Sequence, residues 1–155
     1  AYICQRMLGR VGLADSAADY IEQNKLGPDA LDISLEDFKE AAGNTRKAAK
    51  SFLMDQQTMA GLGNVYSDEI LFHSGIHPKA SASRLDDKRL KKLHKNIHKV
   101  CAYAVKHKAD PTQFGRSYLL PRRKKGADCP RCGGTVRQIK VTGRTSYFCP
   151  TCQTK

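Results

Sequence analysis

The sequence of 155 residues predicts a mainly α-helical bundle that is followed by a small β-hairpin. Three observations support this fold class. Apolar residues recur at three- and four-residue steps between residues 86 and 106, as on one face of an amphipathic helix. Glycines at residues 61 and 63 separate two further helical segments. Near the C-terminus, two Cys-x-x-Cys pairs bracket two segments that alternate like strands.

Residues 1–25 are predicted to form a connector that lies outside the bundle. The first twelve residues show neither a helical nor a strand period, as in a segment that packs on another domain. A short helix is predicted over residues 15–23, and Leu26-Gly27-Pro28-Asp29 has the composition of a turn. The candidate contacts to another domain are the apolar residues Tyr2, Ile3, Met7 and Leu8.

Two helices are predicted between residues 34 and 55. Ser34 and Asp37 have the spacing of a capping box, with aspartate in place of the usual glutamate, and they predict a helix through Ala42. Gly43 then breaks this helix. Residue 44 or 45 is expected to begin the next helix, which carries Arg46, Lys47 and Lys50 and ends with the apolar residues Phe52, Leu53 and Met54.

The run over residues 50–78 is predicted to form a helix, a glycine hinge and a second helix. Gly61 and Gly63 interrupt the first helix, and Asn64 precedes an apolar helical segment that ends at Gly75. A helix N-terminus with an asparagine and free backbone N–H groups is suited to bind phosphate. The alternative is an ordinary helical hairpin in which Asn64 is only a helix cap.

The clearest helix is predicted to begin at Ser83 and Asp86 and to reach Lys106. Its other faces are basic, which is most simply a solvated surface that adds long-range attraction to a polyanion such as DNA. His94 and His98 lie four residues apart, but no carboxylate or cysteine is in register with them, so they are predicted to be surface histidines. The apolar stripe consists of Leu90, Leu93, Ile97, Val100 and Ala104.

Four cysteines predict one structural zinc ion. Cys129 and Cys132 are followed by sixteen residues and then by Cys149 and Cys152, a spacing that provides a closed tetrahedral shell of four thiolates. Residues 135–141 and 144–148 alternate like strands around a Thr142-Gly143 turn, so a zinc-bound β-hairpin is expected. A redox Cys-x-x-Cys motif and two disulfides are the alternatives. A redox motif usually begins a helix in an α/β domain, and that context is missing here.

The charge distribution indicates a polyanionic partner. The formal net charge is +12, yet residues 1–33 hold 3 basic and 5 acidic residues, so the basic charge lies in the rest of the chain. Trp is absent, which argues against a single-strand binder that stacks bases. We see no membrane-spanning run or signal peptide. Only Cys4 and Cys101 lie outside the Cys-x-x-Cys pairs, a pattern that is compatible with a reducing cytoplasm. An intracellular location is therefore expected, in the cytoplasm with the nucleoid.

Two stretches carry a resemblance to a known family. LMD followed by GLGNVYSDEILFHSGIHP resembles the helix-two-turns-helix motif of the formamidopyrimidine-DNA glycosylase/endonuclease VIII family of base-excision repair proteins. GRTSYFCPTCQ resembles the zinc finger of the same family, and the two matches cover about residues 26–155. We therefore expect a connector at 1–25, a helix-two-turns-helix domain at 26–120 and a four-cysteine zinc finger at 121–155, with residues 122–126 as a basic linker.

The resemblance implies a partner and four contact residues. Family members bind double-stranded damaged DNA and flip the damaged base out of the stack. Asn64 and Arg144 match the two principal phosphate contacts, Lys50 matches a lysine that reaches the backbone or the lesion, and Arg46 matches a further backbone contact. Arg144 also matches the arginine proposed to assist the second elimination after base removal. A monomer is expected.

The chemistry of the family is not expected from this chain alone. The family's nucleophile is an N-terminal proline amine that is followed by a catalytic glutamate, whereas this sequence begins Ala-Tyr-Ile-Cys. The expected function is therefore the DNA-binding half of a DNA glycosylase/AP lyase whose catalytic amine lies in a missing N-terminal domain. A non-catalytic nucleic-acid-binding protein and a zinc ribbon for protein–protein assembly are the alternatives.

Overall fold

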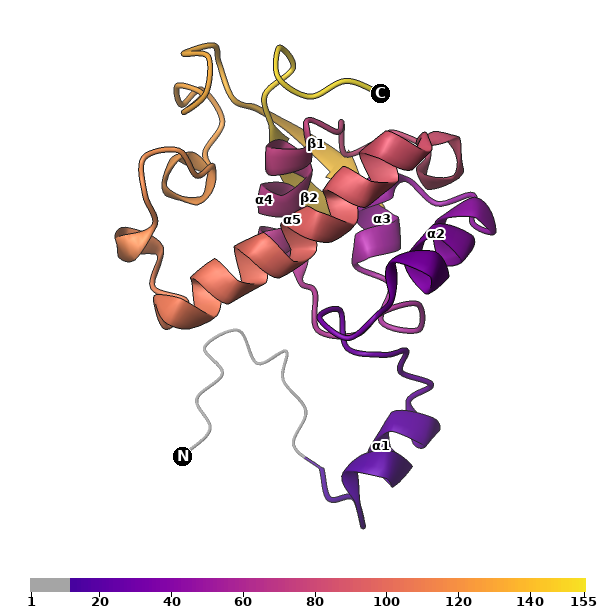
Figure 1. The fold of residues 1–155 in the computed structure, drawn as a ribbon. Helices are drawn as coiled ribbons and strands as arrows, with labels where there is room; N and C mark the ends of the chain where they lie inside the picture. Colours follow the sequence, from indigo (N-terminus) through magenta and orange to yellow (C-terminus); the bar gives the residue numbers. More distant parts are fainter. Residues whose placement is uncertain (1–11) are drawn as a thin grey trace.

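A computed structural model describes residues 12–155, and within them it shows five α-helices followed by a two-stranded hairpin (Figure 1). Residues 1–11 lie outside this range, so the expected contacts of Tyr2, Ile3, Met7 and Leu8 and the environment of Cys4 are not described. The mainly α fold class with a terminal β-hairpin is confirmed. The elements are α1 (Ala17–Gln23), α2 (Leu35–Gly43), α3 (Ala49–Leu53), α4 (Asn64–Ser74), α5 (Asp87–Lys106), β1 (Arg137–Val141) and β2 (Arg144–Phe148).

Side-chain caps fix where three of the α-helices begin, and Ser16 caps α1 by accepting from the backbone N–H of Asp19. The Ser34 hydroxyl accepts a hydrogen bond from the Asp37 backbone N–H at 3.1 Å and donates one to the Asp37 carboxylate at 2.7 Å, so the predicted capping box is confirmed. Asp86 caps α5 by accepting from the backbone N–H of Arg89 at 2.7 Å. The prediction that Ser83 also opens this helix was wrong, because Ser83 lies in a separate 3₁₀ turn over Ala82–Arg84.

The start of α3 differs from the prediction. The helix begins at Ala49, with Ala48 as its N-cap in an extended conformation, rather than at residue 44 or 45. The backbone before it pairs with residues 78–82 instead: Ala82 donates to the carbonyl of Lys47, and Ala49 donates to the carbonyl of Ala80. Because these groups bond across to another segment, they are not available for an earlier helical turn. Arg46 is consequently an exposed residue on an extended segment.

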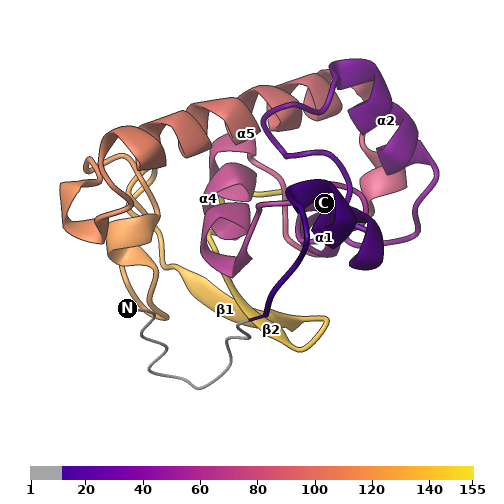
Figure 2. The same ribbon diagram turned by 90° about the horizontal axis from the view of Figure 1, so that it is seen from below.

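Helix α4 occupies the centre of the structure. Figure 2 shows it between α5 on one side and the hairpin on the other. Its side chains are buried on several faces, whereas α5 is amphipathic. The predicted stripe of α5, from Leu90 to Ala104, is buried throughout and is confirmed as its core-facing side. His94 and His98, predicted at the surface, are half-buried. The His94 ring lies 2.9 Å from the carbonyl oxygen of Ile33 and packs against Phe38 of α2, with 5.4 Å between the ring centroids.

Two turns contain residues with positive φ that determine how the chain reverses. Thr142 and Gly143 join β1 to β2 with φ values of 44° and 76°, as a two-residue hairpin turn with the right twist requires. Gly75 ends α4 with φ 74°, and a Cβ there would lie 3.3 Å from the carbonyl oxygen of Cys152. A larger residue at position 75 would therefore strain the backbone and push the zinc finger away.

The segment before α2 packs on the glycine hinge. Gly27 donates to the carbonyl of Gln56, and Ala30 donates to the carbonyl of Ala60. Helix α1 contains no buried residue and lies apart from the bundle (Figure 1). The expected boundary between the connector at 1–25 and the domain at 26–120 stays a prediction. None of the helices within residues 12–155 has both the length and the apolar character needed to cross a membrane.

Candidate metal centre and nucleic-acid interface

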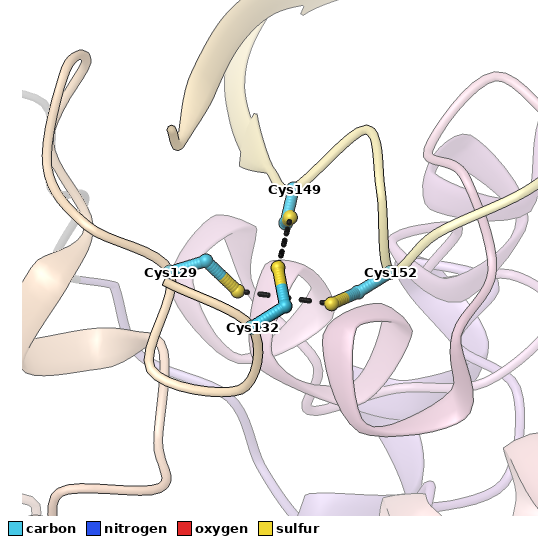
Figure 3. Close-up of side chains that lie close together, drawn as sticks. All are labelled: Cys129, Cys132, Cys149 and Cys152. Atoms are coloured by element: carbon cyan, nitrogen blue, oxygen red, sulfur yellow. Dashed lines mark hydrogen bonds between the residues drawn. The ribbon is translucent and has the colours of Figure 1, made fainter. Parts of the chain in front are cut away.

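The four predicted cysteines converge on one point (Figure 3). Their sulfur atoms all lie within 4.8 Å of one another, with Sγ–Sγ distances of 3.8 Å between Cys129 and Cys152 and 3.6 Å between Cys132 and Cys149. Four thiolates at a zinc–sulfur distance of about 2.3 Å in a tetrahedron would have their sulfurs about 3.8 Å apart. The donor set therefore fits one structural zinc ion with no open position.

Backbone hydrogen bonds shape both ligand turns and favour the thiolate state of one ligand. The N–H of Gly133 donates to the carbonyl of Cys129 at 2.9 Å, and the N–H of Gln153 donates to that of Cys149 at 3.0 Å. The N–H of Gly134, with the neighbouring thiols, lowers the pKa of the Cys132 thiol to about 7. Zinc binds thiolates, so this backbone donor prepares the site for metal.

Hydrogen bonds at the end of the chain join the finger to the turn after α4. The Gln153 side chain accepts from the N–H of Cys149 and donates to the carbonyl of Ile76, both at 2.9 Å. Thr154 pairs with this turn in both directions, donating to Gly75 at 3.1 Å and accepting from His77 at 2.8 Å. The metal site is thus fixed against the helical domain.

A second junction is built around the buried carboxylate of Asp68, which is 0% exposed on α4. Its Oδ1 accepts from Lys50 Nζ and from the Ser146 hydroxyl, both at 2.6 Å. Its Oδ2 lies 2.9 Å from Nε and 2.8 Å from Nη2 of Arg123, and it accepts from the N–H of Tyr147 at 3.1 Å. One carboxylate therefore connects α3, α4, the segment before the finger and strand β2.

Lys50 lies at the centre of this junction, and its side chain is only 1% exposed. Besides Asp68, its ammonium group donates to the backbone carbonyl of Thr145 at 3.2 Å and to that of Asn64 at 3.4 Å. Burial lowers the pKa of Lys50, as does Arg123, while the charge of Asp68 opposes them. Direct contact between Lys50 and DNA stays a prediction. In the described structure, Lys50 links the backbone of Asn64 to the backbone next to Arg144.

The two predicted phosphate contacts line one pocket of about 430 Å³. Asn64 is the first residue of α4, and Arg144 is the exposed first residue of β2. Within residues 12–155, the buried Oδ1 atom of Asn64 has no hydrogen-bond partner. The pocket thus combines a helix N-terminus, a guanidinium and the side-chain amide of Asn64. Only the NH₂ group of that amide can donate to a phosphate, because its oxygen is an acceptor. Its lining consists of Asn64, Val65, Arg123, Gly143, Arg144, Thr145 and Tyr147.

The acidic residues that support this site were not predicted from the sequence. Glu69, like Asp68, is buried, and its carboxylate accepts from the backbone N–H groups of Leu119 at 2.9 Å and Leu120 at 2.7 Å. Two adjacent acids directly before the apolar run over residues 70–72 were a signal that could have indicated buried partners. The description of residues 122–126 as a basic linker was incomplete, because Arg123 is bound to Asp68 and stacks on the ring of Tyr147, 4.8 Å from its centroid.

Comparison with known proteins assigns the family. Residues 26–115 match the family model "Formamidopyrimidine-DNA glycosylase H2TH domain", and residues 128–155 match "Zinc finger found in FPG and IleRS". The chain belongs to the formamidopyrimidine-DNA glycosylase (Fpg) family. The helix-two-turns-helix (H2TH) domain and zinc finger expected from the sequence are confirmed.

Curated relatives differ in how much of their length the chain covers. The Fpg of Bacillus subtilis is 36% identical over 141 residues, which cover 83% of this chain and 50% of that protein. An uncharacterized formamidopyrimidine-DNA glycosylase-like protein of Mycobacterium tuberculosis is 40% identical over 135 residues, covering 83% of this chain and 85% of that protein. The chain therefore spans about half the length of the curated Fpg proteins and most of the mycobacterial one.

Solved structures share the fold. Lactococcus lactis Fpg in a complex with DNA containing an abasic site is 32% identical, with a TM-score of 0.77, over 88% of this chain and 54% of that chain. MutM in complex with DNA containing carbocyclic 8-oxo-G is 33% identical, with a TM-score of 0.74, over 88% of this chain and 53% of that chain. In both cases the match covers about half of the solved protein.

Proposed function

We propose that this chain is the DNA-binding half of a bifunctional DNA glycosylase/AP lyase that removes oxidised bases from double-stranded DNA. The pocket shared by Asn64 and Arg144 carries the proposal, because the family resemblance implies these two residues as phosphate contacts. Solved relatives support the substrate class, since their complexes contain DNA with an abasic site, Fapy-dG or carbocyclic 8-oxo-G. The expected setting is intracellular, as a monomer on DNA.

The pocket explains how phosphate groups would be held. Backbone N–H groups at the start of α4 and the amide of Asn64 would donate to one phosphate, in the electropositive field of the helix N-terminus. The planar guanidinium of Arg144 would bind a second phosphate through two parallel hydrogen bonds. We propose that Arg46, exposed before α3, contacts the backbone further along. Two fixed phosphate contacts on either side of a lesion would favour extrusion of the damaged base between them.

The buried junction gives this pocket its geometry. Lys50 bonds to the backbone of Asn64 and to that of Thr145, the neighbour of Arg144, while Asp68 holds Lys50 in place. We therefore propose Lys50 and Asp68 as positioning residues for the two contacts. To reach DNA itself, Lys50 would have to break its ion pair with Asp68.

The catalytic amine and its partner glutamate are proposed to lie outside this sequence, in the part of Fpg that the chain does not span. Arg144 would then have a second role by resemblance. Its positive charge would stabilise the phosphate that leaves in the second elimination after base removal. Cleavage of the glycosidic bond by this chain alone is not expected.

A second candidate function is a DNA-binding protein that performs no base excision. The mycobacterial relative favours it, because this chain matches 85% of that protein rather than half. Under this alternative the same pocket would bind the same phosphates. The two candidates differ only in whether a catalytic domain acts on the bound DNA.

Binding and trapping on one substrate test the proposal. The substrate is a duplex with one abasic site, and the variants are Asn64→Ala and Arg144→Ala. Matched controls are Asn44→Ala and Arg137→Ala, which change exposed residues outside the pocket. We expect each pocket variant to bind about tenfold or more weakly, as for loss of a charge-assisted hydrogen bond of about 1.5–3 kcal/mol. Unchanged affinity in both pocket variants would contradict the phosphate assignment.

Borohydride then tests the division of labour, because it traps an amine that has attacked the abasic site. We expect the chain to bind this duplex without forming a covalent adduct. A strong adduct would show that an amine of this chain performs the chemistry, which would contradict the proposed role of a separate catalytic part.

A further inference from the structure

Helix α5 carries a line of lysines that the proposed phosphate pocket does not use. Lys88, Lys92, Lys95, Lys99 and Lys106 are all exposed. At 3.6 residues per turn, they fall within about 60° of one another around the helix axis and extend over about 27 Å. Leu93, Ile97 and Val100 occupy the opposite side of the helix and are buried. We call these five residues the lysine stripe.

The stripe faces away from the proposed phosphate pocket. Figure 2 shows α5 on one side of α4 and the hairpin that carries Arg144 on the other. A duplex held between Asn64 and Arg144 would therefore lie on the far side of α4 from the stripe. The lysines cannot be explained as additional contacts to the same stretch of that duplex.

The charge of the stripe is not balanced by nearby acids. Within residues 12–155, no carboxylate oxygen lies within 4.0 Å of any of its five ammonium groups. The one acid inside α5, Asp87, is paired with Lys39 and with Lys91, which lies beside the stripe. Lysines three and four residues apart also repel each other and weaken the helix. The arrangement therefore has a cost in stability and leaves its charge available for a partner.

We propose that the lysine stripe binds the phosphate backbone of a second duplex segment, so that one chain can hold two duplexes. Successive lysines rise by about 4.5–10.5 Å along the helix, which allows each to neutralise a phosphate of a duplex that carries one charge per ~1.7 Å. A straight, unpaired row of flexible ammonium groups fits a continuous polyanion without reading its sequence. An acidic protein segment is the competing partner, and the test separates the two.

A bridging assay tests the proposal. One duplex is fixed on beads, a second duplex carries a fluorophore, and bead-bound fluorescence measures how much the chain joins them. The stripe variant replaces Lys88, Lys92, Lys95, Lys99 and Lys106 with Gln. The matched control makes the same change at five exposed lysines outside the stripe: Lys25, Lys79, Lys108, Lys125 and Lys155. Thermal unfolding of both variants establishes that they are folded.

We expect the stripe variant to lose bridging at least tenfold, while the control retains it. The slope of log DNA affinity against log salt should fall in magnitude by about 4.5 in the stripe variant if each lysine neutralises about one phosphate. Equal bridging and equal salt slopes in the two variants would overturn the proposal. If the stripe variant retains bridging but loses binding to a polyglutamate probe, the proposal is also overturned, in favour of an acidic protein partner.

A failure of the stripe can be distinguished from a failure of the proposed phosphate pocket. The double variant Asn64→Ala/Arg144→Ala should lose bridging yet still bind one duplex at low salt through the stripe. If that variant instead binds and bridges like the unaltered chain, the pocket assignment fails. The comparison of the stripe and control variants would still show whether the lysine stripe binds DNA.

Discussion

Helices α4 and α5 pack against each other but place their charged residues in opposite environments. In α4, Asp68 and Glu69 are buried and accept hydrogen bonds from three neighbouring parts of the chain. In α5, the lysine stripe is exposed and has no carboxylate partner within the described residues. Charges in α4 therefore fix how the modules fit together, whereas those in α5 remain available to a partner. Variants of the two helices should behave accordingly.

Removal of zinc should have the largest effect, because it destroys the finger that Asp68 holds. Structural zinc contributes about 10–16 kcal/mol of apparent binding free energy in small fingers, and the hairpin has little core of its own. With a strong chelator, or in Cys149→Ser, we expect the β-hairpin signals in NMR spectra to disappear and DNA affinity to fall sharply. The helical signal in circular dichroism should largely remain. An intact hairpin in metal-free protein would contradict the zinc assignment.

Asp68→Ala should have the next largest effect. It leaves the buried ammonium of Lys50 and the guanidinium of Arg123 without their counter-ion, and breaking a buried ion pair from one side costs about 3–5 kcal/mol. Urea denaturation should show this loss in the free energy of unfolding. Asp32→Ala is the control, because Asp32 is exposed, and it should change stability by less than about 0.5 kcal/mol. Equal stability of the two variants would show that the junction is not needed for folding.

Glu69→Gln should have a smaller effect than Asp68→Ala. The amide keeps one oxygen acceptor for the N–H groups of Leu119 and Leu120 but places an NH₂ donor against the other, leaving about 1–3 kcal/mol of hydrogen bonding unsatisfied. Hydrogen exchange should show faster exchange of these two amides, with the hairpin amides unaffected. Faster exchange of the hairpin amides instead would contradict this assignment, in which Glu69 holds the segment at Leu119 and only Asp68 holds the hairpin.

Neutralising the lysine stripe should have the smallest effect on stability, and in the opposite direction. The Lys88–Lys92, Lys92–Lys95 and Lys95–Lys99 pairs each repel by about 0.2–0.5 kcal/mol. The variant in which all five lysines are changed to Gln should therefore have a free energy of unfolding equal to, or up to ~1.5 kcal/mol above, that of the unaltered chain. A large loss in urea denaturation would show that these side chains support the fold, which would remove the contrast between the two helices.

The sequence predicted the elements that depend on local patterns. The stripe from Leu90 to Ala104, the Ser34 cap and the Thr142-Gly143 turn each follow from residues close together in the chain. The cysteine spacing predicted the zinc site because four thiolates satisfy one coordination shell. The start of α3 could not be predicted, because it depends on pairing between Lys47 and Ala82, 35 positions later in the chain.

The residues of the candidate site could be predicted, but their environments could not. Asn64 and Arg144 were identified by resemblance, yet only the fold shows that they line one pocket. Lys50 was expected, by resemblance, to reach the DNA backbone or the lesion, whereas its side chain is buried. Its burial depends on Asp68, Thr145 and the path of the hairpin, which no local pattern contains.

A crystal structure of the chain bound to a duplex with one abasic-site analogue would show whether Asn64 and Arg144 hold the phosphates beside the lesion. We expect phosphates within about 3 Å of the Asn64 amide and the Arg144 guanidinium, with Lys50 still paired with Asp68. A duplex that contacts neither Asn64 nor Arg144 and lies only along α5 would contradict this expectation.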